Sequence, residues 1–249
     1  MLPTVHIGPL TLPTAGLILL LFVWIGLARG EKTAPRFGLD PDRFYNLALV
    51  ILVAGIAGAR LGYALRNLPA FLASPGSLIS LSPQMLSLPD GILVGALAGL
   101  IYAQRSNISL GAALDGLTPA LAILMFGVHL ANLASGAAFG AATRLPWGIP
   151  LWGEIRHPTQ IYEALAAALI LLAVWPRGRT IQNMAPGLRF VMFVALTALA
   201  RLALEFFRGD GVLLFGRLRV AQVAAWVIIA LCAVAAGALL RSAQKLKGR

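Results

Sequence analysis

The chain has 249 residues, of which 59% are hydrophobic and only 12% are charged, and its mean hydropathy is +0.85. Soluble domains carry about 25% charged residues, so this composition excludes a soluble globular protein. The formal net charge of +11 does not indicate nucleic-acid binding, because the basic residues lie between apolar segments and form no stripe with interleaved aromatic residues. The sequence predicts an all-α, polytopic membrane helix bundle with a single domain over residues 1–249.

Seven apolar segments are expected to form helices, because a helix of about 20 mainly apolar residues crosses the roughly 30 Å of hydrocarbon in a bilayer. In chain order the expected helices are 12–28, 44–65, 91–104, 109–135, 159–175, 187–207 and 218–240. The third is short for a membrane span. No basic region precedes the first helix, so we expect it to stay as a membrane anchor and not to be a cleaved signal peptide.

The positions of Lys and Arg predict the orientation of the bundle, because basic loops are retained in the cytoplasm. Twelve of these residues lie in the loops after the first, third and fifth helices and in the C-terminal tail, against four on the opposite side. The N-terminus is therefore expected outside and the C-terminus in the cytoplasm. Two outer loops are long: an interfacial arm over 67–90 and a head loop over 136–157. Trp147 and Trp152 of the head loop fit either a compact cap or simple anchoring at the membrane surface.

Polar side chains inside the expected helices are candidates for function, because an ionisable group near the bilayer centre costs several kcal/mol unless it has a partner. These residues are Arg60, Asp115, His129, Asn132, Glu163, Arg201 and Glu205. Mutual ion pairing that stabilises the bundle is the alternative interpretation. For Asp115 we expect such a structural role, with its side chain facing the bundle interior and hydrogen-bonded to a neighbouring helix.

Two groups of polar residues share a helix face, because their members are three or four positions apart. The first group is His129, Asn132 and Gly136, and the second is Arg201, Glu205 and Arg208. A planar guanidinium matches phosphate oxygens with two parallel hydrogen bonds, so the second group predicts contact with an anionic lipid head group. We expect Arg201 and Arg208 to line an outward-opening cavity that also contains His129, Asn132 and Gln160.

The run from Arg156 to Glu163 is the densest polar segment near an expected membrane boundary. Pro158 is expected as the first residue of a helix with His157 as its N-cap, and a helix N-terminus at the outer surface favours phosphate. A capped helix start requires no ligand, so the residues alone leave both interpretations open.

The same run, Arg156-His157-Pro158-Thr159-Gln160-Ile161-Tyr162-Glu163, resembles the prolipoprotein diacylglyceryl transferase family, whose pattern there is Arg-His-Pro-Ser/Thr-Gln-Leu-Tyr-Glu. Further segments resemble the family in the same order along the chain: Gly58–Tyr63, Asp90–Gly95, Asp115 with Gly127–Asn132, Leu145–Gly148, Arg201–Arg208 and Gln222. Each motif is modest alone, and their common order makes the resemblance specific.

The resemblance implies a transferase of the bacterial cytoplasmic (inner) membrane that takes part in lipoprotein biosynthesis. Its reaction moves a diacylglyceryl group from phosphatidylglycerol to the lipobox cysteine thiol of a prolipoprotein signal peptide. The implied partners are phosphatidylglycerol, that signal peptide and membrane lipid, with no cofactor, no metal and no nucleic acid. The single Cys232, inside an apolar run, fits neither a disulfide nor a Cys-based metal site.

Carried over residue by residue, the resemblance implies catalytic roles for Asp90, His129 and Arg201. It implies substrate-binding roles for Arg60, Asn132, Gly136, His157, Gln160, Glu163, Glu205 and Arg208. A protonated His129 and the arginines would face the phosphate, and Asp90 is the candidate base for the thiol.

The chain departs from the family pattern at four places: Asp90 replaces a His, His129 an Arg, Ala137 a Glu, and Ala15-Gly16 a Tyr-Gly. A second hypothesis follows from these departures, namely a catalytically impaired relative that acts as a lipid-binding or partner-binding membrane protein. A transporter is disfavoured, because the sequence shows no internal repeat.

Overall fold

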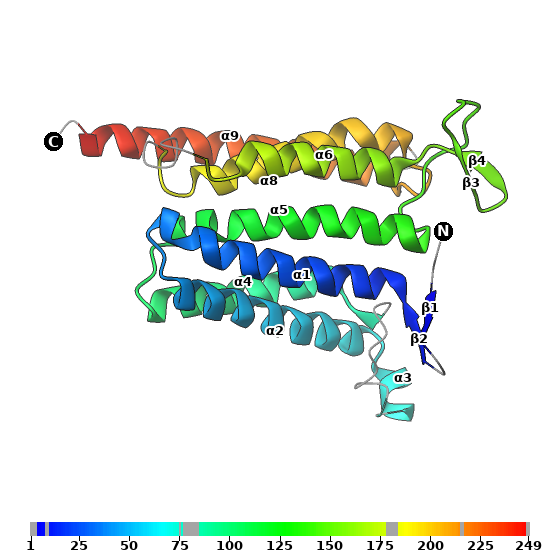
Figure 1. Cartoon of the computed structure of the whole chain (residues 1–249), viewed down its shortest axis with the longest axis horizontal. Helices are drawn as coiled ribbons and strands as arrows, with labels where there is room; N and C mark the ends of the chain where they lie inside the picture. Colours follow the sequence, from blue (N-terminus) through cyan, green and yellow to red (C-terminus); the bar gives the residue numbers. More distant parts are fainter. Residues whose placement is uncertain are drawn as a thin grey trace.

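Long helices with roughly aligned axes make up most of the structure, a computed structural model (Figure 1). It describes residues 4–7, 10–74, 76, 85–177, 184–214 and 217–247. The long helices are α1 Thr14–Thr33, α2 Pro41–Arg66, α4 Leu88–Arg105, α5 Leu110–Ser135, α6 Thr159–Val174, α8 Leu188–Leu204 and α9 Val220–Lys247. Three shorter helical segments are η1 Ala34–Phe37, α3 Leu68–Ala73 and η4 Glu205–Phe207.

Each expected helix corresponds to one of these long helices, in the same order, although several boundaries differ. The first and last helices run further than expected, to Thr33 and Lys247. Five helices of the described chain are long and apolar enough to cross a membrane: α1 with η1, α2, α5, α8 with η4, and α9. The shorter α6 is also apolar. The all-α, polytopic membrane class is therefore confirmed, and the number of seven spans stays a prediction.

The helices pack in two groups on either side of α5 (Figure 1). Helices α6, α8 and α9 lie on one side of it, and α1, α2 and α4 lie on the other. Helices α2 and α4 approach each other closely through glycines: a Cβ on Gly91 would lie 2.8 Å from the Gly55 carbonyl oxygen, and one on Gly95 would lie 2.9 Å from that of Ile51. Small residues allow such backbone contact between membrane helices.

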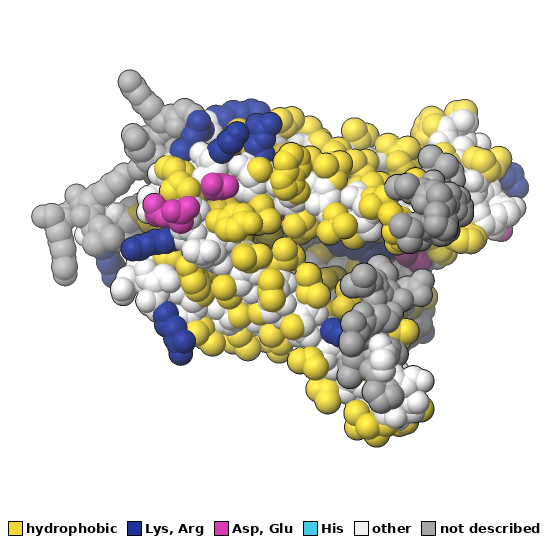
Figure 2. Space-filling model, turned by 60° about the horizontal axis from the view of Figure 1, so that its bottom comes forward, with side chains coloured by type: hydrophobic (Ala, Val, Ile, Leu, Met, Phe, Trp, Pro, Cys, Tyr) yellow, Lys and Arg dark blue, Asp and Glu magenta, His cyan; other side chains and the backbone are white. Residues whose placement is uncertain are grey.

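The outer surface of the bundle is apolar, as expected of a protein in lipid. Hydrophobic side chains cover the middle of the face in Figure 2, and Lys and Arg gather toward the end where α9 finishes. On α6, the exposed side chains Ile161, Leu165, Leu169 and Leu172 repeat every three or four residues along one face. These side chains are 39–67% exposed, so we expect the stripe to meet lipid when the protein is in a bilayer.

Within the described part of the chain, three short antiparallel hairpins supplement the helices: β1 Thr4–Ile7 with β2 Leu10–Pro13, β3 Ile149–Leu151 with β4 Glu154–Arg156, and β5 Leu213–Leu214 with β6 Leu218–Arg219. The sequence did not predict these strands. The turn between β3 and β4 uses left-handed φ angles of 54° at Trp152 and 81° at Gly153. Asn-Gly is the usual sequence signal of such a turn. Here tryptophan, which seldom adopts a left-handed φ, stands in place of the asparagine, so the sequence did not indicate the turn.

The expected head loop, 136–157, is fixed to the segment that follows α8. The Ala141 N–H donates to the Phe207 carbonyl at 2.8 Å, and the Gly209 N–H donates to the Phe139 carbonyl at 3.0 Å. Part of the expected arm, 67–90, lies outside the described residues, namely 75 and 77–84. Its described part includes α3 and the first turn of α4, so residues 88–90 are helical.

Asp115 joins α5 to the beginning of α8. Its side chain is buried, and its carboxylate accepts hydrogen bonds from the N–H groups of Gly187, at 2.7 Å, and Phe190, at 3.0 Å. The first N–H groups of a helix have no partner within the helix, and α8 has no capping side chain of its own at Gly187. The expectation that Asp115 faces the interior and bonds a neighbouring helix is confirmed.

Replacing Asp115 tests this cross-helix cap. Asp115→Leu leaves two buried N–H groups without an acceptor and should destabilise the protein by about 3 kcal/mol. Asp115→Asn keeps one acceptor oxygen and should cost only about 1 kcal/mol. Thermal unfolding of the purified variants in detergent measures the difference, and equal losses in both would contradict the assignment.

Candidate functional site

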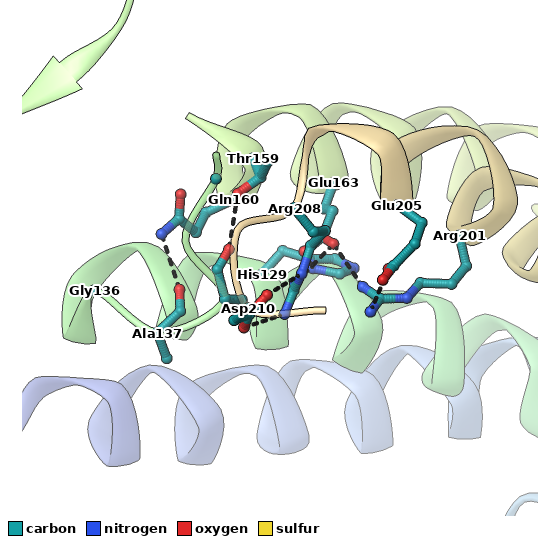
Figure 3. A network of polar contacts seen from close by, with 12 residues as sticks. His129, Gly136, Ala137, Thr159, Gln160, Glu163, Arg201, Glu205, Arg208 and Asp210 are labelled. Atoms are coloured by element: carbon teal, nitrogen blue, oxygen red, sulfur yellow. Dashed lines mark hydrogen bonds and ion pairs between the residues drawn. The ribbon is translucent and has the colours of Figure 1, made fainter. Parts of the chain in front are cut away.

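Glu163 is the centre of a buried ionic cluster (Figure 3). One oxygen of its carboxylate, Oε2, lies 3.1 Å from Nδ1 of His129. The other, Oε1, lies 3.0 Å from Nη1 of Arg201 and 3.0 Å from Nη1 of Arg208. Glu163 itself is only 5% exposed. Three basic side chains from separate parts of the chain therefore converge on one carboxylate.

Helix packing brings these side chains to the same place. Glu163 is on the face of α6 that is buried against its neighbours, and its position about one turn after the start of the helix puts it near the hairpin end of the bundle. His129 lies toward the end of α5, Arg201 is in the last turn of α8, and Arg208 directly follows η4. Since both α5 and α8 pack against α6, their charged side chains reach it from two sides.

Further ion pairs extend the cluster along the end of α8. Glu205 is fully buried, and its Oε2 lies 2.8 Å from Nη2 of Arg201. Arg208 forms two hydrogen bonds with Asp210, at 2.7 and 2.6 Å. Burial lowers the pKa of Arg208, but the ion pairs with Glu163 and Asp210 outweigh this and raise the pKa above its ordinary value. Arg208 is therefore charged at any physiological pH.

Arg219 and Asp210 belong to the cluster although sequence reasoning did not single them out. Nη1 of Arg219 donates to the carbonyl oxygens of Glu205, at 2.9 Å, and Arg208, at 3.1 Å. It also lies 3.6 Å from Oε1 of Glu205. Arg219 thus holds the turn on which Arg208 is mounted. It is the last residue of β6, directly before α9, and a basic residue at a helix boundary gives no signal of such a contact.

A small cavity of about 70 Å³ adjoins the cluster. His129, Glu163 and Arg201 are its charged or titratable lining residues, and apolar side chains of α5, α6 and α8 form most of the remaining wall. Of the five residues expected to share one cavity, His129 and Arg201 line this one, whereas Asn132, Gln160 and Arg208 do not. The volume matches about two water molecules, far below the roughly 300–1,000 Å³ of typical small-molecule sites.

Gln160 and Gly136 shape the beginning of the head loop. The Gln160 side chain is fully buried and donates from Nε2 to the Ala137 carbonyl at 2.9 Å (Figure 3). Gly136 ends α5 with a left-handed φ of 75°, a conformation that glycine adopts without strain. Asn132 lies one turn earlier on α5. The bond from Gln160 holds the loop against the N-terminus of α6.

His157 lies beside the cluster in an aromatic group. Its ring packs edge-on against Phe207, at a centroid distance of 5.2 Å, and against Tyr162, at 6.2 Å. Nε1 of Trp147 donates to the Tyr162 hydroxyl at 2.8 Å. The expectation that His157 is the N-cap was wrong: α6 begins at Thr159, its capping position is Pro158, and no side chain makes a capping hydrogen bond there.

Asp90 and Arg60 belong to a second polar group, on α2 and α4. Oδ1 of Asp90 lies 2.8 Å from Nη2 of Arg66, and Nη1 of the same arginine donates to the Ser87 hydroxyl at 2.7 Å. Arg60 donates to the Met85 carbonyl at 3.2 Å. The structure therefore joins His129, Arg201, Glu205 and Arg208 around Glu163, while Asp90 is paired on the other helix group.

The fold and the site define a class: a polytopic helical membrane protein with a buried ionic cluster near one end of its bundle. The sequence model of the prolipoprotein diacylglyceryl transferase family matches residues 3–237, and the chain belongs to this family. The resemblance seen in the sequence motifs is thereby confirmed.

Similar proteins named phosphatidylglycerol–prolipoprotein diacylglyceryl transferase occur in several bacteria. That of Synechococcus elongatus is 29% identical over 240 residues, which covers 91% of this chain and 83% of the relative. That of Solidesulfovibrio magneticus is 34% identical over 182 residues, 69% of this chain and 68% of the relative. That of Geobacter sulfurreducens is 34% identical over 188 residues, which covers 72% of this chain and 70% of the relative.

Replacing Glu163 tests whether it holds the cluster together. Glu163→Gln leaves Arg201 and Arg208 without the charge that they share and should destabilise the protein by about 3 kcal/mol. Removing one of the stranded charges as well, in Glu163→Gln with Arg208→Gln, should recover about 1 kcal/mol of that loss, because the two sites are coupled.

Thermal unfolding of the single and double variants in detergent measures the coupling free energy between Glu163 and Arg208. Glu154→Gln is the matched control, because Glu154 is 56% exposed at the side chain and pairs with Arg156 at the surface. Such pairs contribute less than about 1 kcal/mol. Additive effects of the Glu163 and Arg208 substitutions would show that the two residues do not depend on each other.

Proposed function

We propose that this chain transfers a diacylglyceryl group from phosphatidylglycerol to the lipobox cysteine of a prolipoprotein. In this reaction the cysteine sulfur attacks the glyceryl carbon that carries the phosphate ester. A carbon–sulfur bond forms, the carbon–oxygen bond breaks, and glycerol phosphate leaves with the bonding electron pair. The thiol proton passes to a base. The products are a thioether-linked diacylglyceryl group and free glycerol phosphate.

The convergence of His129, Arg201 and Arg208 on Glu163 is the observation that carries this proposal. A departing phosphate monoester gains negative charge, and guanidinium groups fixed in advance stabilise such charge without reorganising. In the present arrangement Glu163 occupies the inner side of both arginines. A phosphate would therefore bind at their remaining N–H groups, and Glu163 and Glu205 would set the orientation of the guanidinium planes. Family membership gives the same reaction class.

Activation of the thiol requires a second feature. A free cysteine has a pKa near 8.5, so a base or a nearby positive charge is needed to produce the thiolate nucleophile. Asp90 is the candidate base in this chain, and His129 is a candidate for the nearby positive charge. Asp90 offers a carboxylate close to the outer end of α4, and its neighbour Arg66 would also favour a thiolate. Arg60, Asn132, Gly136, His157 and Gln160 then complete the binding surface for the two substrates.

A second candidate function is lipid or partner binding without turnover. The pairing of Asp90 with Arg66 favours it, because the ion pair occupies an oxygen of the carboxylate that would accept the thiol proton. The presence of His at position 129 favours it too, since histidine offers a positive charge only when it is protonated.

The proposed location is the bacterial cytoplasmic (inner) membrane, with the N-terminus outside and the C-terminus in the cytoplasm. The chain then forms one membrane domain, with the arm 67–90 and the head loop 136–157 on the outer side. This orientation puts the Glu163 cluster near the outer surface, because the cluster lies toward the hairpin end of the bundle and α9 finishes at the other end.

Reporter fusions test the orientation. A reporter after Arg249 should be active only in the cytoplasm, and one inserted near Gly140 only outside, because basic loops stay in the cytoplasm. Phosphatase and fluorescent-protein fusions read the two sides independently. Reversed signals would contradict both the orientation and the outward-facing site.

Two substitutions distinguish the enzyme from the binding protein, in an assay with labelled phosphatidylglycerol, a lipobox peptide and purified protein. Arg201→Lys keeps the charge but loses the planar fork, and at a phosphate site it should cost about 1–3 kcal/mol of transition-state stabilisation. His129→Arg supplies a permanent charge and should raise thioether formation if the cluster is catalytic.

Arg144→Lys is the matched control, because it makes the same chemical change outside the cluster, at an exposed residue of the head loop. It should leave thioether formation unchanged. Normal turnover in Arg201→Lys, with no gain from His129→Arg, would reject a catalytic cluster and favour the binding protein.

A further inference from the structure

We propose that the chain also binds an anionic phospholipid at the opposite end of α6 from the Glu163 cluster. The site is a cavity of about 470 Å³ lined by Arg36, Leu171, Leu172, Trp175, Pro176 and Arg177. Twelve residues separate Glu163 from Trp175 on α6, which is about 18 Å along a helix. The two sites are therefore distinct, and this proposal does not depend on transferase activity.

Two guanidinium groups come to this cavity from separate parts of the chain. Arg36 belongs to η1, at the end of the first membrane helix, and Arg177 follows the end of α6. None of the described residues that line the cavity is acidic. Arg36 is held in place, because its Nη1 donates to the Pro176 carbonyl, and its remaining N–H groups can bind a phosphate. The lining thus offers positive charge that no carboxylate in the cavity neutralises.

The C-terminus of a helix ordinarily repels an anion, because its last carbonyl groups carry partial negative charge. Here arginines meet the carbonyl groups at and just after the end of α6. The buried Arg189 donates to the Val174 carbonyl at 2.7 Å and to the Trp175 carbonyl at 3.4 Å, and Arg36 donates to the Pro176 carbonyl. These bonds reduce the repulsion at the helix end, and Arg36 and Arg177 add positive charge in the cavity itself.

The surroundings of the cavity select a lipid instead of free phosphate. Leu172 belongs both to the cavity lining and to the exposed stripe of α6 formed with Ile161, Leu165 and Leu169. A molecule with an anionic head in the cavity can therefore extend its acyl chains along this stripe. Trp175 also lines the cavity, and tryptophan is favoured at membrane surfaces, because its ring has both an apolar body and a polar N–H group. The volume is also within the range of about 300–1,000 Å³ for small-molecule sites.

Quenching of Trp175 by brominated lipids tests the proposal. The full chain is reconstituted in nanodiscs of phosphatidylcholine, and the signal of Trp175 is taken as the difference between wild type and Trp175→Phe. Acyl-brominated phosphatidylserine should quench this signal at much lower mole fraction than acyl-brominated phosphatidylcholine. Each arginine near a membrane surface contributes about fivefold in affinity for anionic lipid, so a preference of about 20-fold is expected.

The variant Arg36→Gln with Arg177→Gln should reduce this preference to about twofold or less. Glutamine still offers an N–H to the Pro176 carbonyl, so the fold is retained, and unchanged thermal unfolding checks this. The matched control is Arg43→Gln with Arg105→Gln, which removes two exposed arginines at the same end of the bundle. If the control loses the preference equally, the attraction is a general effect of charge and the site is rejected.

Two further outcomes would overturn the proposal. Displacement of the brominated phosphatidylserine by inorganic phosphate, beyond the effect of chloride at equal ionic strength, would identify a free-phosphate site. Absence of quenching by either brominated lipid would show that protein covers Trp175, either a second copy of the chain or another of its segments.

Discussion

The structure depends on the burial of a carboxylate, Glu163, in an apolar helix bundle. An isolated charge in such surroundings is prohibitively costly, so the fold must bring basic partners to it. His129 fixes how α5 faces α6, and Arg201 fixes how α8 faces α6. Arg208 requires the chain to fold back after η4. The interaction that the site needs is therefore the same one that sets the relative positions of three helices.

The head loop follows from this arrangement. Once Arg208 is drawn toward Glu163, the backbone of residues 207–209 lies beside residues 139–141, and hydrogen bonds join them. Gln160 adds a bond from α6 to the loop at Ala137. At the other end of the bundle, Asp115 and Arg189 satisfy main-chain groups of neighbouring helices in the same way. Buried charges at both ends thus substitute for the hydrophobic driving force that membrane helices lack.

The sequence predicted the helices and identified most of the polar residues of the cluster, but it did not predict how those residues pair. Long apolar segments identify helices because the bilayer permits little else. The Arg201–Glu205 pair was accessible, since a spacing of four places both on one face. The central role of Glu163 was not, because its partners lie on other helices and no spacing within one helix reveals them. Arg219 was missed for the same reason, because its partners precede α9. Asp210 pairs with Arg208 outside a helix, where helical spacing gives no guide, and the strands were missed because segments of two to four residues are too short to stand out.

The residue at position 129 decides the net charge of the cluster. Three carboxylates, Glu163, Glu205 and Asp210, are matched in the described structure by three guanidinium groups, Arg201, Arg208 and Arg219. With a neutral His129 the cluster therefore carries no net charge, and protonation of His129 adds one positive charge. The family pattern has Arg at this position, which would make that charge permanent. A permanent charge at this position would add to what the paired arginines offer a departing phosphate, whereas a histidine side chain carries a charge only in its protonated form.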